Sequence, residues 1–141
     1  MEIFKNININ PNNRMTSDCI IRALSLFLNQ DYYVTLNDLM TIYLNTGFHI
    51  SDPVCFMIYL TKFKNIHKTE SDYRQRLILK NMCIDIQNNE FDKLNNIDEK
   101  NSNKILVFLD NSHLTYLEKG VIIDSWDCST MKINAYYSYK Y

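Results

Sequence analysis

The amino-acid sequence predicts an α+β fold, with helices in the first half and an antiparallel sheet at the end. Apolar residues between positions 20 and 28 recur at the spacing of a helix, whereas short apolar runs with strand-like alternation follow position 104. A chain of 141 residues is long enough for one domain with its own core. We therefore expect residues 1–141 to form a single domain.

The first helix is expected to begin at Cys19. Asp18 directly precedes it and is a residue type that caps helix N-termini. The apolar side chains of this helix fall on one broad face, which predicts a central position in the core. These side chains belong to Ile20, Ala23, Leu24, Phe27 and Leu28.

The second helix is predicted over residues 36–45. Thr35 and Asp38 resemble a capping box at its start, with Asp in place of Glu. Gly47 is expected to end it, because glycine adopts the left-handed conformation found after many helices.

Two further helices are expected before the sheet. Asp52 is a suitable cap and Pro53 suits a first helical position, so a third helix should continue over 54–63. A fourth is predicted over 73–82, followed by a short strand at 83–86.

The last third of the chain has the pattern of strands. Residues 87–104 are polar and predict a long surface loop. A buried strand at 104–110 follows, then a hairpin over 112–126 with its turn at 118–120, and a closing strand at 131–141.

Charge and composition exclude several classes of function. The formal net charge is -1, and the chain has no dense Lys/Arg cluster of the kind that neutralises phosphates, so nucleic acid is not an expected partner. The first residues contain no apolar segment of signal-peptide length, and the apolar run at 105–109 is too short to span a bilayer. We expect a cytoplasmic protein with no membrane partner.

The cysteines predict neither a disulfide framework nor a metal centre. They stand at positions 19, 55, 83 and 128, and no two form a Cys-x-x-Cys pair. In a cytoplasmic protein these thiols should be reduced. No cofactor is expected, because the remaining His residues lack zinc-ligand spacing.

Cys19, His113 and Asp124 are the candidate catalytic residues. A thiol at a helix N-terminus has its thiolate stabilised by the positive end of the helix dipole. In a hairpin that turns at 118–120, His113 and Asp124 fall at the same end of neighbouring strands, where a carboxylate can orient an imidazole. For an isolated cysteine, the plainer interpretation is a small buried core residue.

These residues resemble the papain-like cysteine peptidase superfamily. The order Cys, His, Asp is that of the superfamily, and the cysteine begins the first long helix. Asp124-Ser125-Trp126 resembles the Asn-Ser-Trp of papain, where the Asn orients the catalytic His and the Trp shields their hydrogen bond. The resemblance implies a papain-like fold with an N-terminal helical half, a nucleophile helix and a C-terminal antiparallel sheet.

A closer resemblance is to small papain-like proteins, many of them from phages and bacteria. Their pattern is approximately Asn-Asp-Cys-x-x-Arg-Ala-Leu near the start, with His, Gly, Asp-x-Trp-Asp and Ser near the end. The match covers both ends of the chain and leaves residues 35–104 unassigned. The matching residues are Ser17-Asp18-Cys19-Ile20-Ile21-Arg22-Ala23-Leu24 and then His113, Gly120, Asp124, Trp126, Asp127 and Ser129, with Ser17 in place of Asn.

The resemblance also assigns supporting roles. Papain-like enzymes place an oxyanion-stabilising Gln ahead of the nucleophile; none is present here, and Asn13 is the expected replacement, with Asn12 as the alternative. Trp126 should shield the catalytic hydrogen bond. Arg22 is expected to pair with Asp18 or Asp127 and hold the local fold, or else to favour the thiolate.

The expected function is that of a thiol hydrolase, a peptidase or isopeptidase acting on a protein or peptide through a thioester acyl-enzyme. Acyl transfer to an amine would use the same residues. A second hypothesis is a weakly active or inactive binding protein on the same fold, such as a phage factor that binds a host protein. A third is a metal site formed by Cys19, His113 and Asp124, which has few ligands for a catalytic zinc.

Overall fold

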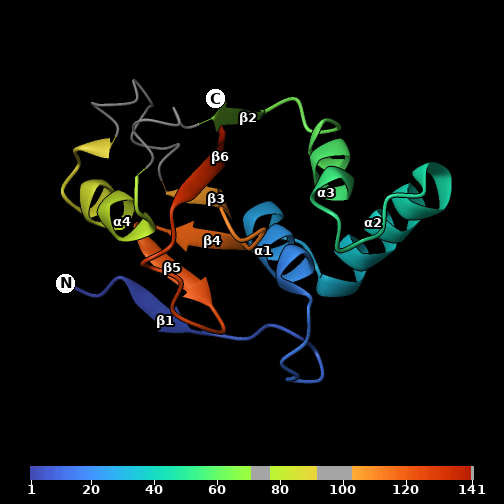
Figure 1. The fold of residues 1–141 in the computed structure, drawn as a ribbon, viewed down its shortest axis with the longest axis horizontal. Coiled ribbons are helices and arrows are strands. Elements are labelled where there is room, and N and C mark those ends of the chain that lie inside the picture. Colours follow the sequence, from blue (N-terminus) through green and yellow to red (C-terminus); the bar gives the residue numbers. More distant parts are fainter. Residues whose placement is uncertain (71–76, 92–102, 141) are drawn as a thin grey trace.

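The computed structural model describes residues 1–70, 77–91 and 103–140 and has a mixed α+β architecture. Within these residues, four helices accompany a six-stranded sheet with the strand order β1-β5-β4-β3-β6-β2, and α2 packs on α1 and α3 at the outer edge of the fold (Figure 1). The elements are β1 (Phe4–Asn6), α1 (Cys19–Leu28), α2 (Tyr32–Thr46), α3 (Pro53–Leu60), β2 (Ile66–Glu70), α4 (Leu79–Gln87), β3 (Lys104–Leu109), β4 (Leu114–Glu118), β5 (Val121–Asp124) and β6 (Ile133–Tyr139).

The predicted antiparallel strands of the C-terminal part are confirmed, but the sheet as a whole is mixed. Strands β3 to β6 pair antiparallel, whereas β1 joins the edge of β5 in parallel. The antiparallel edge strand β2 comes from the first half of the chain. Neither β1 nor β2 was expected, because β1 has three residues and β2, Ile-His-Lys-Thr-Glu, lacks apolar alternation.

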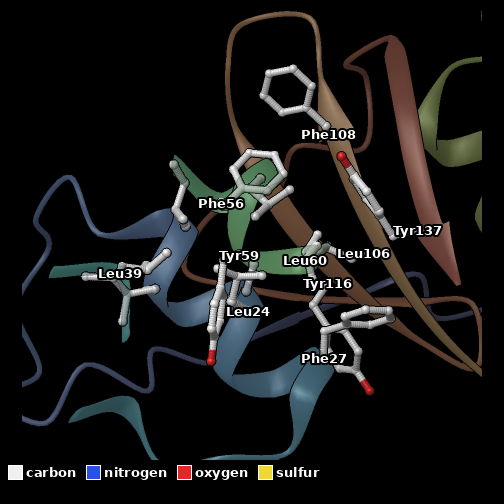
Figure 2. Close-up of a cluster of buried hydrophobic side chains, with 14 of the residues drawn as sticks. Leu24, Phe27, Leu39, Phe56, Tyr59, Leu60, Leu106, Phe108, Tyr116 and Tyr137 are labelled. Atoms are coloured by element: carbon white, nitrogen blue, oxygen red, sulfur yellow. The ribbon is translucent and has the colours of Figure 1, made fainter. Parts of the chain in front are cut away.

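Helices cover both faces of the sheet. Alternate residues of β3 enter two separate cores: Leu106 and Phe108 face α1 to α3, whereas Ile105, Val107 and Leu109 face α4. Figure 1 shows α1 and α4 on opposite sides of β4 and β5. The larger core is aromatic-rich. Figure 2 shows several of its members, including Leu24, Phe27, Leu39, Phe56, Tyr59, Leu106, Phe108 and Tyr137.

Helix α1 begins at Cys19 as predicted, and its broad apolar face is buried. The expected cap is wrong, since the Asp18 side chain makes no capping hydrogen bond. Its carboxylate is bonded to Arg22 instead. Asn29, in the left-handed conformation, follows the last residue of the helix.

Helix α2 begins at Tyr32 rather than at residue 36. Asp31 caps it by accepting a hydrogen bond from the Tyr33 backbone N–H. Thr35 is buried inside the helix and accepts a hydrogen bond from the Ser25 hydroxyl, so it is no cap. Gly47 is confirmed as the left-handed residue at the C-terminus.

Helix α3 is capped by Asp52 and has Pro53 in its first turn, as predicted, but ends at Leu60. The strand predicted at 83–86 is wrong, because α4 extends over these residues. The buried residues of α4, Leu79, Met82, Cys83 and Ile86, recur at helical spacing. Parts of two predicted elements, the helix at 73–82 and the loop at 87–104, together with Tyr141, lie outside the described residues.

No helix in the described part of the chain combines the length and apolar character needed to cross a membrane.

Candidate active site

The three predicted catalytic residues come together where α1 begins and the β4–β5 hairpin has its open end. Lys119 and Gly120 both have positive φ angles and form a tight turn, which pairs Tyr116 with Ile123. This register brings His113, which immediately precedes β4, next to Asp124 at the end of β5. Their side chains are joined by a hydrogen bond of 2.7 Å between Nε2 and Oδ2.

The thiol of Cys19, at the first position of α1, interacts electrostatically with the His113 side chain and with the backbone of Leu114. The Asp124 carboxylate occupies Nε2 of His113, so Nδ1 is the ring nitrogen that does not face Asp124. The predicted nucleophile, base and orienting carboxylate therefore lie together between the start of α1 and the open end of the hairpin.

Electrostatics favour a charged Cys19–His113 pair. Burial raises the pKa of the Cys19 thiol, but hydrogen bonds with His113 and Leu114 and the positive charges of His113 and Arg22 outweigh it, and the pKa lies below its usual 9.0. Burial likewise lowers the pKa of His113, but hydrogen bonds to Asp124, Cys128 and the Cys19 thiol raise it to about 11. Both directions favour thiolate and imidazolium.

The Asp124 carboxylate is held from several sides. Oδ1 accepts hydrogen bonds from the Ser125 backbone N–H at 2.7 Å and from Arg22 Nη1 at 3.0 Å. Oδ2 accepts from the Thr115 hydroxyl at 2.6 Å in addition to His113. Burial alone would raise the pKa of Asp124, but these donors and the charge of His113 hold it below 3.8. Asp124 is therefore an ionised, fixed acceptor.

Arg22 pairs with Asp18, one of the two expected partners, and with Asp124. Its Nε lies 2.8 Å from Asp18 Oδ1, and all three side chains are buried. Asp127, the other expected partner, accepts a hydrogen bond from the Ser129 backbone N–H in the loop after β5. The structure thus places Asp127 in a turn and connects Arg22 directly to the Asp124 carboxylate.

Trp126 lies beside the His113 imidazole. The centroids of the Trp126 and His113 rings are 4.9 Å apart, with their planes tilted by 51°. Trp126 is 38% exposed, whereas His113 is 8% exposed. The shielding of the His113–Asp124 hydrogen bond by Trp126 stays a prediction.

Asn13 is not brought to the site by any hydrogen bond found among the described residues. It is exposed, has a φ of 52°, and its backbone N–H donates to the Asn10 carbonyl. Asn10 is the more engaged residue of this segment, because its side-chain amide donates to Asp18 Oδ2 at 2.8 Å. The role of Asn13 in oxyanion binding stays a prediction.

Four contributing residues were not anticipated. Thr115 is two positions beyond His113 on a strand, so side-chain alternation along the strand could have indicated it. Cys128 is buried with its thiol 3.9 Å from Asp124 Oδ2, but nothing in its sequence context indicated a role. Asn10 and Tyr32 both donate to Asp18 Oδ2 from distant parts of the sequence.

One group of possible metal ligands occurs among the described residues, formed by His113, Asp124 and Cys128 with ligand atoms within 4.8 Å of one another. It includes Cys128 rather than Cys19. The 2.7 Å separation of the His113 and Asp124 atoms is that of a hydrogen bond. Two tetrahedral zinc ligands at 2.0–2.1 Å from the metal would lie roughly 3.3 Å apart. The adjacent Arg22 charge also disfavours a cation, so the arrangement fits a hydrogen-bonded triad better.

No protein-family model, curated protein or solved structure matches this chain.

Proposed function

We propose that this chain is a papain-like thiol hydrolase that acts on a protein or peptide through Cys19, His113 and Asp124. The observation that carries the proposal is the position of His113, which interacts with the thiol at a helix N-terminus and is hydrogen-bonded to a buried carboxylate. Cys19 is also partly exposed, whereas Cys55, Cys83 and Cys128 are buried. Among the four, only Cys19 has the partial exposure that a nucleophile needs.

The reaction would begin with attack of the Cys19 thiolate on a carbonyl carbon of the substrate, which forms an S–C bond and an oxyanion. As the C–N bond breaks, the imidazolium of His113 gives its proton to the leaving amine. A water molecule then attacks the thioester while His113 takes a proton from it. Breaking the C–S bond releases the carboxylic acid and regenerates the thiolate. Asp124 keeps the imidazole in the productive orientation throughout.

The oxyanion would be stabilised at the start of α1. The backbone N–H of Cys19 precedes the first intrahelical hydrogen bond, which runs from the Arg22 N–H to the Asp18 carbonyl. Asp18 does not cap this end, so its carboxylate does not compete for these donors. We propose Asn13 as the second donor, which requires the segment before α1 to bring its side chain to the substrate.

A second candidate function is that of a binding protein with little or no turnover. The observation that favours it is the place of Asn13, whose exposed side chain has no hydrogen bond to the site among the described residues. A site with a charged thiol but a weak oxyanion hole would bind or acylate without rapid release. Acyl transfer to an amine is the variant of the first proposal in which an amine replaces water.

Labelling with a peptide-based electrophile tests the nucleophile. We expect label on Cys19, none in Cys19→Ala, and much slower labelling in His113→Ala. His67→Ala is the matched control, because His67 is an exposed residue of the edge strand β2. If Cys19 were labelled at the same rate in His113→Ala as in the parent protein, the triad would be contradicted.

Cleavage of a peptide library, with Cys19→Ala as the blank, tests turnover. Cleavage products that depend on Cys19 support the hydrolase. Labelling at Cys19 without any cleavage favours the binding protein. Products joined to an added amine indicate acyl transfer.

A further inference from the structure

Arg22 is shared between two buried carboxylates from different parts of the fold. Its Nε bonds Asp18 Oδ1 at 2.8 Å and its Nη1 bonds Asp124 Oδ1 at 3.0 Å. Asp18 immediately precedes the nucleophile, whereas Asp124 is the carboxylate that orients His113. Each of the three side chains is less than a tenth exposed, so solvent screens the interactions between their charges only weakly.

We propose that Asp18 and Arg22 form a positioning pair. Asp18 partly neutralises the positive charge of Arg22, and this determines how strongly the negative charge of Asp124 acts on His113. The consequence is that this pair sets the pH range in which Cys19 is reactive. The inference rests on the proposed function in one respect, since it assumes that Cys19 and His113 are the reacting pair.

The physical reason lies in the alternation of charges. Neighbouring groups in this series of contacts carry opposite charges. The series runs from Asp18 (negative) through Arg22 (positive), Asp124 (negative) and His113 (positive) to Cys19 (negative). If Arg22 were bonded to Asp124 alone, its positive charge would offset more of the negative charge of Asp124. Asp124 would then stabilise the imidazolium less, and the pKa of His113 would be lower. With Asp18 on its other side, Arg22 holds Asp124 in place without fully neutralising it.

Asp18 is itself held firmly in this position. Its Oδ2 accepts hydrogen bonds from the Asn10 amide and the Tyr32 hydroxyl, each at 2.8 Å. One donor comes from the segment before α1 and the other from α2, so both parts of the fold hold the Asp18 carboxylate in place. They help Arg22 to keep the pKa of Asp18 below its usual range although burial opposes this. The carboxylate is thus available to Arg22 as an anion at neutral pH.

The other titratable groups around the site do not carry this role. Cys128 faces His113 and Asp124 from the loop after β5, but its thiol is buried. Tyr32 faces Asp18 from α2, and burial together with its hydrogen bond to Asp18 raises its pKa to about 12, so its hydroxyl stays neutral. Arg22 is therefore the only permanent positive charge among the groups that contact Asp18 or Asp124 in the described residues.

The test is the pH dependence of Cys19 alkylation by iodoacetamide, with the modified residue identified by mass spectrometry. Asp18→Asn frees the full Arg22 charge, so the midpoints of the acidic and alkaline limbs both move to lower pH. Arg22→Met removes that charge, and both midpoints move to higher pH. Asp85→Asn on α4, on the opposite face of the sheet, is the control that leaves them in place.

The double variant Asp18→Asn/Arg22→Met separates the pair from a direct effect of Asp18 on the thiol. If Asp18 acts through Arg22, its replacement shifts the midpoints far less when Arg22 is already absent. An equal shift in both backgrounds overturns the inference. If Arg22→Met does not fold, unchanged midpoints in Asp18→Asn alone overturn it as well, because a merely structural pair would alter stability without moving them.

These outcomes are independent of turnover, because alkylation needs no substrate carbonyl. Shifted midpoints in a protein that cleaves no peptide support the positioning pair and contradict the hydrolase. Cleavage dependent on Cys19 with unmoved midpoints supports the hydrolase and contradicts the positioning pair.

Discussion

His113 bonds Asp124 through Nε2 at 2.7 Å, and this contact leaves Nδ1 as the ring nitrogen that does not face the carboxylate. The carboxylate lies at the end of β5, whereas Cys19, whose thiol also interacts with His113, lies at the start of α1. Because both groups act on one imidazole, a change at Asp124 should alter the reactivity of Cys19.

Asp124→Asn is the most direct test of that connection. An amide oxygen can still accept the Nε2 hydrogen bond, but it lacks the charge that stabilises the imidazolium, so the pKa of His113 falls. We expect the alkaline limb of the alkylation profile to move to lower pH, because the Cys19 thiolate loses its imidazolium counter-ion at a lower pH. Peptide cleavage should fall by roughly 10²-fold or more. The Asp85→Asn protein should match the parent, and an unchanged profile in Asp124→Asn would show that the carboxylate has no electrostatic role.

Thr115 offers a conservative test of how Asp124 is held. Thr115→Val keeps the shape of the side chain but removes the hydroxyl that donates to Asp124 Oδ2 at 2.6 Å. A hydrogen bond to a buried charge contributes about 1.5–3 kcal/mol, and we expect that loss in the free energy of unfolding measured with urea. The pKa of His113 should rise, because Asp124 then has one donor fewer.

Thr115→Ser is the matched control for this change. It retains the hydroxyl, so it should preserve the His113 titration measured by NMR even if the lost methyl group lowers stability. Equal displacement of the His113 titration in the Val and Ser proteins would mean that packing, not the hydrogen bond, is responsible.

The contrast between Thr115 and Cys128 shows which parts of the site a sequence can disclose. The positions of His113 and Asp124 follow from local rules, because the turn at Lys119 and Gly120 fixes the register of the hairpin. The contribution of Thr115 could be inferred as well, because side chains two positions apart on a strand lie on the same face. Cys128 comes from an irregular loop whose path depends on packing against α4, and local rules do not determine such contacts.

The errors in the fold have similar causes. The Asp18 carboxylate has the right chemistry for a cap, but buried Arg22 is a stronger partner than backbone amides, and Arg22 needs Asp124 from a distant strand to complete its bonds. Strand β2 is polar because it is an edge strand, so its pairing with β6 depends on a long-range contact. In both cases tertiary contacts override a local preference.

The Cys19–His113 pair should leave a signature in stability against pH. In the folded chain, the pKa of Cys19 lies below 9.0 and that of His113 is raised from 6.5 to about 11. The raised His113 pKa gives stability that is present below pH 6.5 and is lost as the pH rises. The lowered Cys19 pKa gives stability that grows until pH 9.0. Between the lowered Cys19 pKa and pH 9.0 the two effects oppose each other, so the free energy of unfolding should fall less steeply with pH than His113 alone would make it fall.

Cys19→Ser removes one side of that balance. Asp124 still raises the pKa of His113, so stability should now decline above pH 6.5, with a slope approaching about 1.4 kcal/mol per pH unit. Urea unfolding at several pH values between 6 and 9 measures the slope. A flat dependence in Cys19→Ser would mean that His113 is not held as an imidazolium in the folded protein.

Gly120 tests whether the hairpin that carries the site depends on α4. Gly120 and Gly47 have nearly the same φ, 80° and 81°, which is strained for any residue with a Cβ. A Cβ on Gly120 would lie 2.8 Å from both the Cys83 carbonyl oxygen and Gln87 Cγ, whereas one on Gly47 would meet nothing within 4 Å. Gly47→Ala should therefore cost about 1–2 kcal/mol from backbone strain alone. Gly120→Ala should cost a further ~1–3 kcal/mol because the turn must move away from a carbonyl oxygen of α4. Equal losses in the two urea-unfolding experiments would show that the turn does not need this close approach, and that the register of His113 and Asp124 rests on the hairpin alone.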